Sequence, residues 1–461
     1  MIVELTVDLH AHSVFAGGTQ SLKLTPEQLA TNQKKAVSHL EKTNETMPLK
    51  GIDLVGTGDC QFTIWTDILE DVLVEDVPGV YYLADNYHTR FILQTEIIFT
   101  LPVLKRKKIA HVIFLFPSFP SVRSFTDLLD GWGVKHEKMA RPFVKCDSSI
   151  QIAKRINQIL DLNPFIEAIP AHIMTPQGVF GSNVRINNLN DFFGDVTNRI
   201  HAVETGLSAD PQFLGLIPEL DNKTLISCSD AHSSALHRMG REFTVISLPK
   251  ISFSNIITAL RKNNVIRTAE FPPEEGRFFL TGHRGGRKSP GLHEENEYCF
   301  FSPRHVPKKD ICPICHKTLT VGVFQRCVEI SREQGTERVL SDVVPNQKFV
   351  RIVPLIDILS NTMGVKTKTA KSLVNKYREI ISLTGPESRI WDLSVQEIEM
   401  KLSNKIEENI ISDLIHIKEG NFTFYPYGYD GEYGSLQIGK IGDFSDIKVV
   451  RSNKPRQQQL F

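Results

Sequence analysis

The chain has 461 residues, more than a single typical core accommodates, and we therefore expect two or three domains. Lys plus Arg and Asp plus Glu both number 53, so the net charge neither indicates nor excludes a nucleic-acid partner. The hydrophobic content of 41% is ordinary for a globular protein, and no apolar run approaches the roughly 20 residues of a membrane span.

The N-terminal pattern and the cysteines indicate a cellular compartment. The chain begins directly with a strand pattern, without the charged and apolar segments of a secretory signal. Of the seven cysteines, several crowd into one stretch: Cys299, Cys312, Cys315 and Cys327. This odd number and this grouping favour a metal knuckle over a disulfide framework. We therefore expect a cytoplasmic protein without a membrane partner.

Strand-like and helical patterns alternate over residues 1 to about 265. The predicted strands are 3–8, 53–56, 91–94, 109–116, 166–171, 200–204 and 224–228, and the clearest predicted helices are 149–161 and 253–263. Such alternation predicts a parallel sheet or a barrel. Polar residues that can carry chemistry follow several of these strands, which favours a barrel, because barrel sites gather at the carboxyl ends of the strands.

The first predicted strand leads into two histidines, His10 and His12. Side chains alternate along a strand, so residues two positions apart point the same way. Two imidazoles that point to one place can share a metal ion. Taken alone this is a weak indication, because most histidine pairs of this spacing are ordinary residues.

Further residues of metal-binding type lie beside short apolar runs. They are Asp59, Glu96, His111, His172, Asp230 and His232. Each histidine alone could be a hydrogen-bonded core residue, and Asp230 alone could cap a helix. Glu96, however, lies between the apolar triplets 91–93 and 97–99, where an unpaired carboxylate is costly. Together these residues predict more than one ion of zinc, manganese or iron, and hydrolysis of a phosphoester as the reaction.

The character of the sequence changes after Arg267, where a Pro- and Glu-rich linker precedes the cysteine cluster. Cys312 and Cys315 have the spacing of half a tetrahedral zinc site, and Cys299 is a third candidate ligand. We expect His305 as the fourth ligand, with His283 and His316 as weaker choices. Cys327 lies in a helical stretch and is interpreted as a packing residue. The alternative is a knuckle that holds no metal.

Residues 352–418 have helical patterns and end in a strand-like segment near 422–438. A Gly-Lys turn at 364–371 lies between two of the predicted helices. The backbone amides of this turn, with Lys366, Lys368 and Lys371, could bind DNA phosphates. An ordinary turn between helices is the alternative reading.

The last residues, 451–461, are polar and end in Gln457, Leu460 and Phe461. Glutamine followed by an aliphatic and an aromatic residue at a chain end resembles peptides that bind DNA sliding clamps, where the apolar pair fills a pocket. Low-complexity glutamine is the alternative, but it does not explain the two apolar residues.

The metal-binding residues resemble, in kind and in order, those of the polymerase-and-histidinol-phosphatase (PHP) superfamily. The resemblance implies a (β/α)7-type barrel and a three-metal site. It assigns the first ion to His10, His12, Glu96 and Asp230, the second to Glu96, His111 and His172, and the third to Asp59 and His232. Asp59 stands where relatives have histidine, and the histidine that many relatives carry after His12 is absent.

A closer resemblance is to the endonuclease Q family. It is carried by residues 55–59, 204–211, 229–233, 240–242, 270–276, 312–315, 319–323 and 428–434. The resemblance implies an α/β protein with a PHP-type barrel, an appended zinc knuckle and an α+β C-terminal DNA-binding region. The implied domains are 1–265, the catalytic barrel; 266–340, the linker and knuckle; 341–445, the DNA-binding region; and 446–461, the tail.

The implied activity is cleavage of DNA on the 5′ side of uracil, hypoxanthine, xanthine or an abasic site. Asp230, Glu96 and His232 would be catalytic, and Zn²⁺ would serve both metal sites, with Mg²⁺ or Mn²⁺ as alternatives in catalysis. The expected partners are damaged DNA and a sliding clamp, and the expected state is a monomer. Two other functions stay open: a PHP-type phosphatase of small phosphomonoesters, and an inactive nucleic-acid-binding protein.

Overall fold

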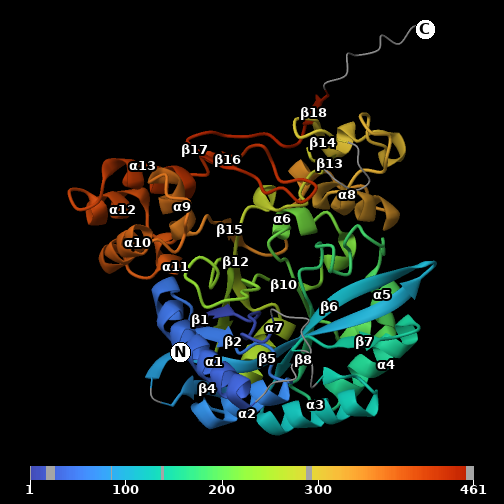
Figure 1. Cartoon of the computed structure of the whole chain (residues 1–461), viewed down its shortest axis with the longest axis vertical. Coiled ribbons are helices and arrows are strands. Elements are labelled where there is room, and N and C mark those ends of the chain that lie inside the picture. Colours follow the sequence, from blue (N-terminus) through green and yellow to red (C-terminus); the bar gives the residue numbers. More distant parts are fainter. Residues whose placement is uncertain (1, 17–25, 85, 137–139, 287–292, 453–461) are drawn as a thin grey trace.

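The computed structural model describes residues 2–16, 26–84, 86–136, 140–286 and 293–452 (Figure 1). The N-terminal part of the chain forms the lower half of the molecule in Figure 1, and the C-terminal helices and small sheets lie above it. Within the described ranges, no helix is both long enough and apolar enough to cross a membrane.

The N-terminal half is built on one large sheet. Its first strand, β1 (Val3–Asp8), pairs in parallel with β2 (Leu54–Gly56), which pairs in parallel with β5 (Asn86–Val103). The sheet continues through β6 (Arg106–Phe116) to β8 (Glu167–Pro170), and both of these pairings are antiparallel. A separate parallel pair joins β9 (Ala202–Glu204) to β10 (Thr224–Ile226).

The other edge of β1 carries the rest of this sheet. The strands on this side are β11 (Phe243–Leu248), β12 (Val265–Glu270) and β15 (Phe349–Arg351). The remaining strands of the sheet are β3 (Leu73–Val77), β4 (Val80–Leu83) and β7 (Phe143–Lys145). β11 runs antiparallel to β1 and to β12.

The predicted strands are confirmed, but the sheet is parallel only in part. The sheet is mixed because Leu104 and Lys105 alone separate β5 from β6, and so short a turn can join only antiparallel strands.

Helices cover the sheet with apolar faces. In the N-terminal half they are α1 (Pro26–Lys50), α2 (Thr63–Val72), α3 (Phe119–Gly131), α4 (Ser149–Leu160), α5 (Leu189–Phe193), α6 (Pro211–Leu214) and α7 (Phe253–Arg261). In α4, Ile152, Ile156 and Ile159 recur at helical spacing and are fully buried. The hydroxyl of Ser148 accepts a hydrogen bond from the Gln151 backbone N–H and so caps the first turn. The predicted helices at 149–161 and 253–263 are confirmed.

The C-terminal half consists of short strands around two groups of helices. The strands are β13 (Thr281–His283), β14 (Tyr298–Phe301) and β18 (Lys448–Arg451), which form one sheet, and β16 (Phe422–Phe424) and β17 (Leu436–Ile438), which form another. The helices are α8 (Val323–Glu333), α9 (Leu355–Thr362), α10 (Lys371–Thr384), α11 (Glu387–Ile390), α12 (Val395–Leu402) and α13 (Glu408–Lys418). The helical prediction for 352–418 is confirmed.

A buried ion pair joins the two halves. Lys50, the last residue of α1, places Nζ 2.6 Å from Oε2 of Glu387 in α11. The Tyr377 hydroxyl donates to the same oxygen at 2.7 Å, and Oε1 of Glu387 accepts the Leu355 backbone N–H at 2.8 Å. Because the ammonium and carboxylate groups are both buried, each depends on the other for compensation of its charge.

Candidate metal centre

His10 and His12 extend the line of β1 and point into one buried place. His10 Nε2 lies 3.6 Å from Glu96 and 3.7 Å from Asp230, and His12 Nε2 lies 3.6 Å and 3.1 Å from the same two carboxylates. Neither Nε2 atom has a hydrogen-bond partner among the described residues, although both are buried. Buried ring nitrogens left without partners beside two carboxylates are the pattern that a bound cation would satisfy.

Glu96 lies at the centre of the site. Oε1 of this fully buried carboxylate lies 2.6 Å from Nδ1 of His111 and 3.2 Å from Nε2 of His172. One group of possible ligands therefore comprises Glu96, His111 and His172, and another comprises His10, His12 and Glu96. Glu96 belongs to both groups, as expected of a carboxylate that bridges two ions.

A third group comprises His12, Asp230 and His232. His232 Nε2 lies 3.5 Å from Asp230, and the His232 ring stacks on that of His12 with centroids 4.3 Å apart. The His232 side chain is 45% exposed, so this group lies on the open side of the site.

Asp59 does not take the ligand position predicted for it. One of its oxygens lies 3.3 Å from Nδ1 of His12, and the other accepts hydrogen bonds from the backbone N–H and the hydroxyl of Ser13 at 2.9 and 2.6 Å. The carboxylate is occupied in orienting His12 and is absent from the ligand groups. The place predicted for Asp59 beside His232 is taken by Asp230 and His12.

Glu204, at the end of β9, is a site residue that the sequence prediction missed. Its carboxylate accepts a hydrogen bond from Nδ1 of His10 at 3.0 Å and from the His172 backbone N–H at 2.7 Å. It therefore fixes the His10 ring so that Nε2 faces the site. The available signal was a glutamate that closes a short apolar strand, whereas Glu96 was identified by its place between two apolar triplets.

The backbone at the site adopts conformations that ordinary residues avoid. Asp59, His172 and Asp230 have φ values of 47°, 29° and 46°. Gly206 also has positive φ, and a Cβ atom there would lie 2.4 Å from Cβ of His172. Such conformations cost free energy and persist where the surrounding contacts hold a functional geometry.

Neighbouring charges control the protonation of the histidines. Burial opposes protonation of His10, but the carboxylates of Glu204 and Asp230 raise its pKa to about 10. Burial likewise opposes protonation of His12, and contacts with Asp59 and Asp230 raise its pKa to about 9. Burial disfavours a charged Asp230, yet the two histidines hold the pKa of its carboxyl group well below the ordinary value. The site thus concentrates negative charge that cations, or protons, must balance.

The residues present fit a multinuclear site. Imidazole and carboxylate donors suit zinc, manganese and iron. The donor atoms within each of the three groups lie within 4.8 Å of one another, and Glu96 and His12 link the groups. Two of the imidazoles have their outer nitrogens fixed by carboxylates, which is the support that metal-bound histidines characteristically have.

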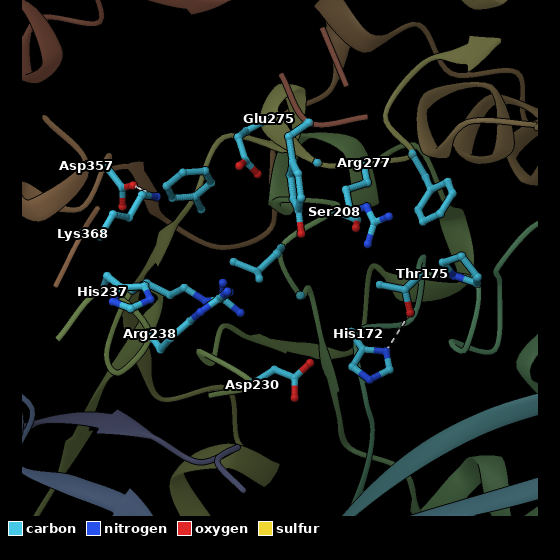
Figure 2. Close-up of a pocket in the computed structure, with 18 of the residues that line it drawn as sticks. His172, Thr175, Ser208, Asp230, His237, Arg238, Glu275, Arg277, Asp357 and Lys368 are labelled. Atoms are coloured by element: carbon cyan, nitrogen blue, oxygen red, sulfur yellow. Dashed lines mark hydrogen bonds and ion pairs between the residues drawn. The ribbon is translucent and has the colours of Figure 1, made fainter. Parts of the chain in front are cut away.

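A cavity of about 750 Å³ opens beside the metal groups, between the N- and C-terminal halves (Figure 2). In Figure 2, His172 and Asp230 lie on one side of it, and Glu275 and the Lys368–Asp357 ion pair lie across from them. Its lining is rich in cations, namely Arg238, Arg241, Arg277, Lys366 and Lys368. Of the predicted DNA-binding lysines, the cavity thus contains Lys366 and Lys368, whereas Lys371 begins α10 and is not part of the lining.

A second group of metal-binding residues lies in the C-terminal half. It comprises His283, His293, Cys312 and Cys315. Nδ1 of His283 lies 3.4 Å from Sγ of Cys315, and Nε2 of His293 lies 3.3 Å from Sγ of Cys312. The other ring nitrogen of each histidine donates to a backbone carbonyl, of Thr318 and Glu297 respectively, so the nitrogens that face the sulfurs are free to bind a metal.

This group differs from the predicted zinc ligands. His305 does not lie in it, and its imidazole pairs with Asp446 instead. The weaker choice, His283, joins the group, and His293 was missed because no cysteine-histidine spacing marks it. Cys299 lies next to the group, with Sγ 3.6 Å from that of Cys312, but it is not among the four residues that converge. Gln457, Leu460 and Phe461 lie outside the described residues.

The chain resembles proteins that are themselves uncharacterised. It is 28% identical over 248 residues to a protein of Methanocaldococcus jannaschii, and this match covers 51% of the chain and 28% of that protein. It is 24% identical over 444 residues to YqxK of Bacillus subtilis, covering 94% of the chain and 99% of that protein. No protein-family model matches the chain.

Two solved structures are similar over nearly the whole chain. The lesion-specific endonuclease PfuEndoQ from Pyrococcus furiosus superposes with a TM-score of 0.71 and 24% identity, covering 95% of this chain and 96% of that one. A complex of endonuclease Q with a 27-mer duplex that has an abasic lesion at the active site superposes with a TM-score of 0.70 and 24% identity, covering 95% and 97%. The chain therefore has the fold of endonuclease Q.

Proposed function

We propose that this chain, which has the fold of endonuclease Q, is a metal-dependent DNA repair endonuclease of that family. It would cut the phosphodiester on the 5′ side of a deaminated base or an abasic site. We further propose that residues 1–265 are its PHP-type catalytic barrel, 266–340 its zinc knuckle and 341–445 its DNA-binding region. The observation that carries the proposal is the convergence of His10 and His12, with unpartnered nitrogens, on Glu96 and Asp230 beside a cation-lined cavity.

The chemistry follows from the groups around Glu96. Bound metal ions would supply a hydroxide nucleophile and charge stabilisation for phosphodiester cleavage. Arg141 places Nη1 3.3 Å from Glu96, and its side chain is 28% exposed, so it can also reach a substrate phosphate. Asp230, 31% exposed, stands between the buried ligands and the cavity, where a substrate would enter.

The cavity supports a nucleic-acid substrate. Its volume of about 750 Å³ is within the range of pockets that hold a small molecule, and a nucleotide turned out of the duplex is a ligand of that kind. The arginines and lysines of its lining can bind the flanking phosphates, while Ser208, Thr175 and Gln177 offer hydrogen bonds to a base edge. A small phosphomonoester would leave most of this lining unused.

The test is a nicking assay on end-labelled duplexes that contain one uracil, one hypoxanthine, one abasic site or no lesion. The purified chain is supplied in turn with Mg²⁺, Mn²⁺ and Zn²⁺, and the Asp230→Ala variant is the control. We expect cleavage 5′ of the lesion and little cleavage of the undamaged duplex. Turnover of small phosphomonoesters without nicking would favour a phosphatase instead. DNA binding with no turnover of either substrate would indicate an inactive nucleic-acid-binding protein.

We also propose that Gln457, Leu460 and Phe461 form a peptide that binds a DNA sliding clamp. Two large apolar residues at the end of a polar segment favour burial by a partner. Tethering to a clamp would raise the local concentration of the enzyme on DNA without any new contact to the bases.

A further inference from the structure

The outer part of the β5–β6 ribbon projects from the sheet as a separate two-stranded feature (Figure 1). The two strands stay paired as far as Val103 and Arg106. In the described part of the chain, β7 pairs with β5 only at residues 98–100, and β8 pairs with β6 only at 112–115. Residues 101–108 therefore extend beyond all neighbouring strands.

This ribbon continues beyond Glu96 in the direction in which β1 and β2 run. β5 runs parallel to β1 and β2, and it passes Glu96 only after leaving its pairing with β2 at Ile92. Leu104, at the turn, is eight positions beyond Glu96, which at about 3.3 Å per residue is a distance of about 25 Å. That distance corresponds to about 7 base pairs of duplex DNA.

The tip combines one apolar side chain with three cationic ones. Leu104 is 99% exposed and has a φ of 52°, a conformation that favours glycine. Lys105, Arg106 and Lys107 follow it and are all exposed. Among the described residues, no carboxylate forms an ion pair with any of the three.

The ribbon is held in place by the segment that follows His172. The buried Lys108 donates from Nζ to the carbonyl of Gly181 at 3.1 Å, and Arg106 donates from Nη1 to the carbonyl of Asn183 at 3.0 Å. These two bonds use backbone oxygens, so they fix the ribbon without neutralising the positive charge of its side chains. Lys105 and Lys107 remain available to a partner.

We propose that this tip binds the duplex that carries the lesion, about 7 base pairs from the cleaved bond, with Lys105 and Lys107 on phosphates and Leu104 in the minor groove. The inference rests on the proposed function and extends it to duplex binding away from the cavity. Cations without acidic partners match a phosphate backbone. Apolar side chains that enter the minor groove commonly bend DNA, so a projecting leucine beside such cations suits this surface better than it suits a protein partner.

The test compares the wild type with a triple variant, Leu104→Gly, Lys105→Ala and Lys107→Ala. Glycine suits the positive φ at position 104, so the turn is retained. Lesion duplexes are made with an arm of about 4 or about 15 base pairs on either side of the lesion, and only a long arm can reach the tip. Binding is measured by fluorescence anisotropy at several salt concentrations, and nicking is measured on the same duplexes.

On the duplex whose long arm reaches the tip, we expect the variant to bind about tenfold more weakly. The slope of log affinity against log salt concentration should fall by the amount expected for about two lost phosphate contacts. On duplexes with two short arms, the variant and the wild type should bind equally, and kcat should be unchanged. The matched control is Lys250→Ala with Lys262→Ala. Both lysines are exposed, and Lys250 follows Leu248, which pairs with Val3 at the opposite end of β1 from the site.

Equal binding of variant and wild type to every duplex would overturn the inference and leave the tip free for a protein partner. If the variant lost the same amount of affinity for duplexes with short arms as for duplexes with long arms, the inference would be overturned too. If the wild type binds the duplexes in this length-dependent way but cuts none of them, the proposed function fails and the inference stands.

Discussion

Glu204 and His10 form a buried pair in which the carboxylate accepts a hydrogen bond from Nδ1 at 3.0 Å and leaves Nε2 facing the metal centre. The same carboxylate also accepts the backbone N–H of His172. One side chain at the end of β9 thus orients ligands of two different metal groups. Its own oxygens are occupied by these bonds, so it acts through the histidines and not as a ligand.

The Glu204→Gln variant should therefore bind metal more weakly while retaining the fold. We expect its affinity for Mn²⁺ to fall by about 10- to 100-fold, because the His10 ring loses a charged partner that orients it. Metal titration of nicking and calorimetry both measure the change, and excess metal should restore the rate. The matched control is Glu167→Gln, which removes a buried carboxylate that pairs with His201 at the start of β8, away from the metal centre. A rate that excess metal cannot restore would argue for a direct role of Glu204.

Replacing either central carboxylate should abolish cleavage but not DNA binding. Glu96→Ala removes a residue shared by two of the metal groups, and Asp230→Ala removes the carboxylate of the third group. The loss of several kcal/mol of transition-state stabilisation corresponds to about a thousandfold or more in rate. Anisotropy with lesion DNA should change little, because the cations of the cavity and of the ribbon tip remain. Normal cutting by Asp230→Ala would show that the reactive ion is elsewhere.

The residues of the candidate metal centre were largely predictable, because strand ends in one sheet converge and because histidines and acids stood out against apolar runs. Their roles were not. Asp59 and Glu204 both follow short strands, and only the backbone conformation decides that each orients a histidine. The antiparallel β5–β6 pairing depends on a turn that carries no glycine signal. His293 bonds to the cysteine group through tertiary packing that no sequence spacing records.

Metal affinity should rise with pH. In the metal-free chain, the pKa values of His10 and His12 are about 10 and about 9, so both imidazoles carry protons at neutral pH. A metal ion must displace these protons, and the apparent affinity should increase by up to about a hundredfold per pH unit below pH 9. Calorimetry with Mn²⁺ in buffers of different ionisation enthalpy would count the released protons. Binding that releases none would contradict the protonated state.

The knuckle should lose its metal when His293 is replaced but not when His305 is replaced. His293→Ala removes one of four converging donors, and a hundredfold loss of zinc affinity corresponds to about 2.7 kcal/mol of stability at fixed zinc. His305→Ala only breaks the contact with Asp446 and should leave the zinc content unchanged. Metal content and thermal unfolding with and without chelator measure both effects. The reverse pattern would restore His305 as the ligand.

Deletion of residues 457–461 should remove binding to the host's sliding clamp and leave nicking of short oligonucleotides unchanged. The deletion takes away the apolar pair that would fill the clamp pocket and touches neither metal group. Surface plasmon resonance against the purified clamp is the direct measurement, and a variant in which only Leu460 and Phe461 become alanine is the matched control. Undiminished clamp binding by both variants would place the clamp contact elsewhere.

The buried contact of Lys50 with Glu387 bears on how the protein selects its substrate. The helices that this contact ties to α1 belong to the same group that presents Asp357 and Lys368 to the cavity. Pulling them away would break this ion pair and the hydrogen bond that Ser388 donates to the carbonyl of Gly51. The contact therefore opposes a change in the width of the cavity. Selection among nucleotides would then depend on which nucleotide can leave the DNA duplex and fit a preformed cavity. It would not depend on closure of the domains around a bound nucleotide.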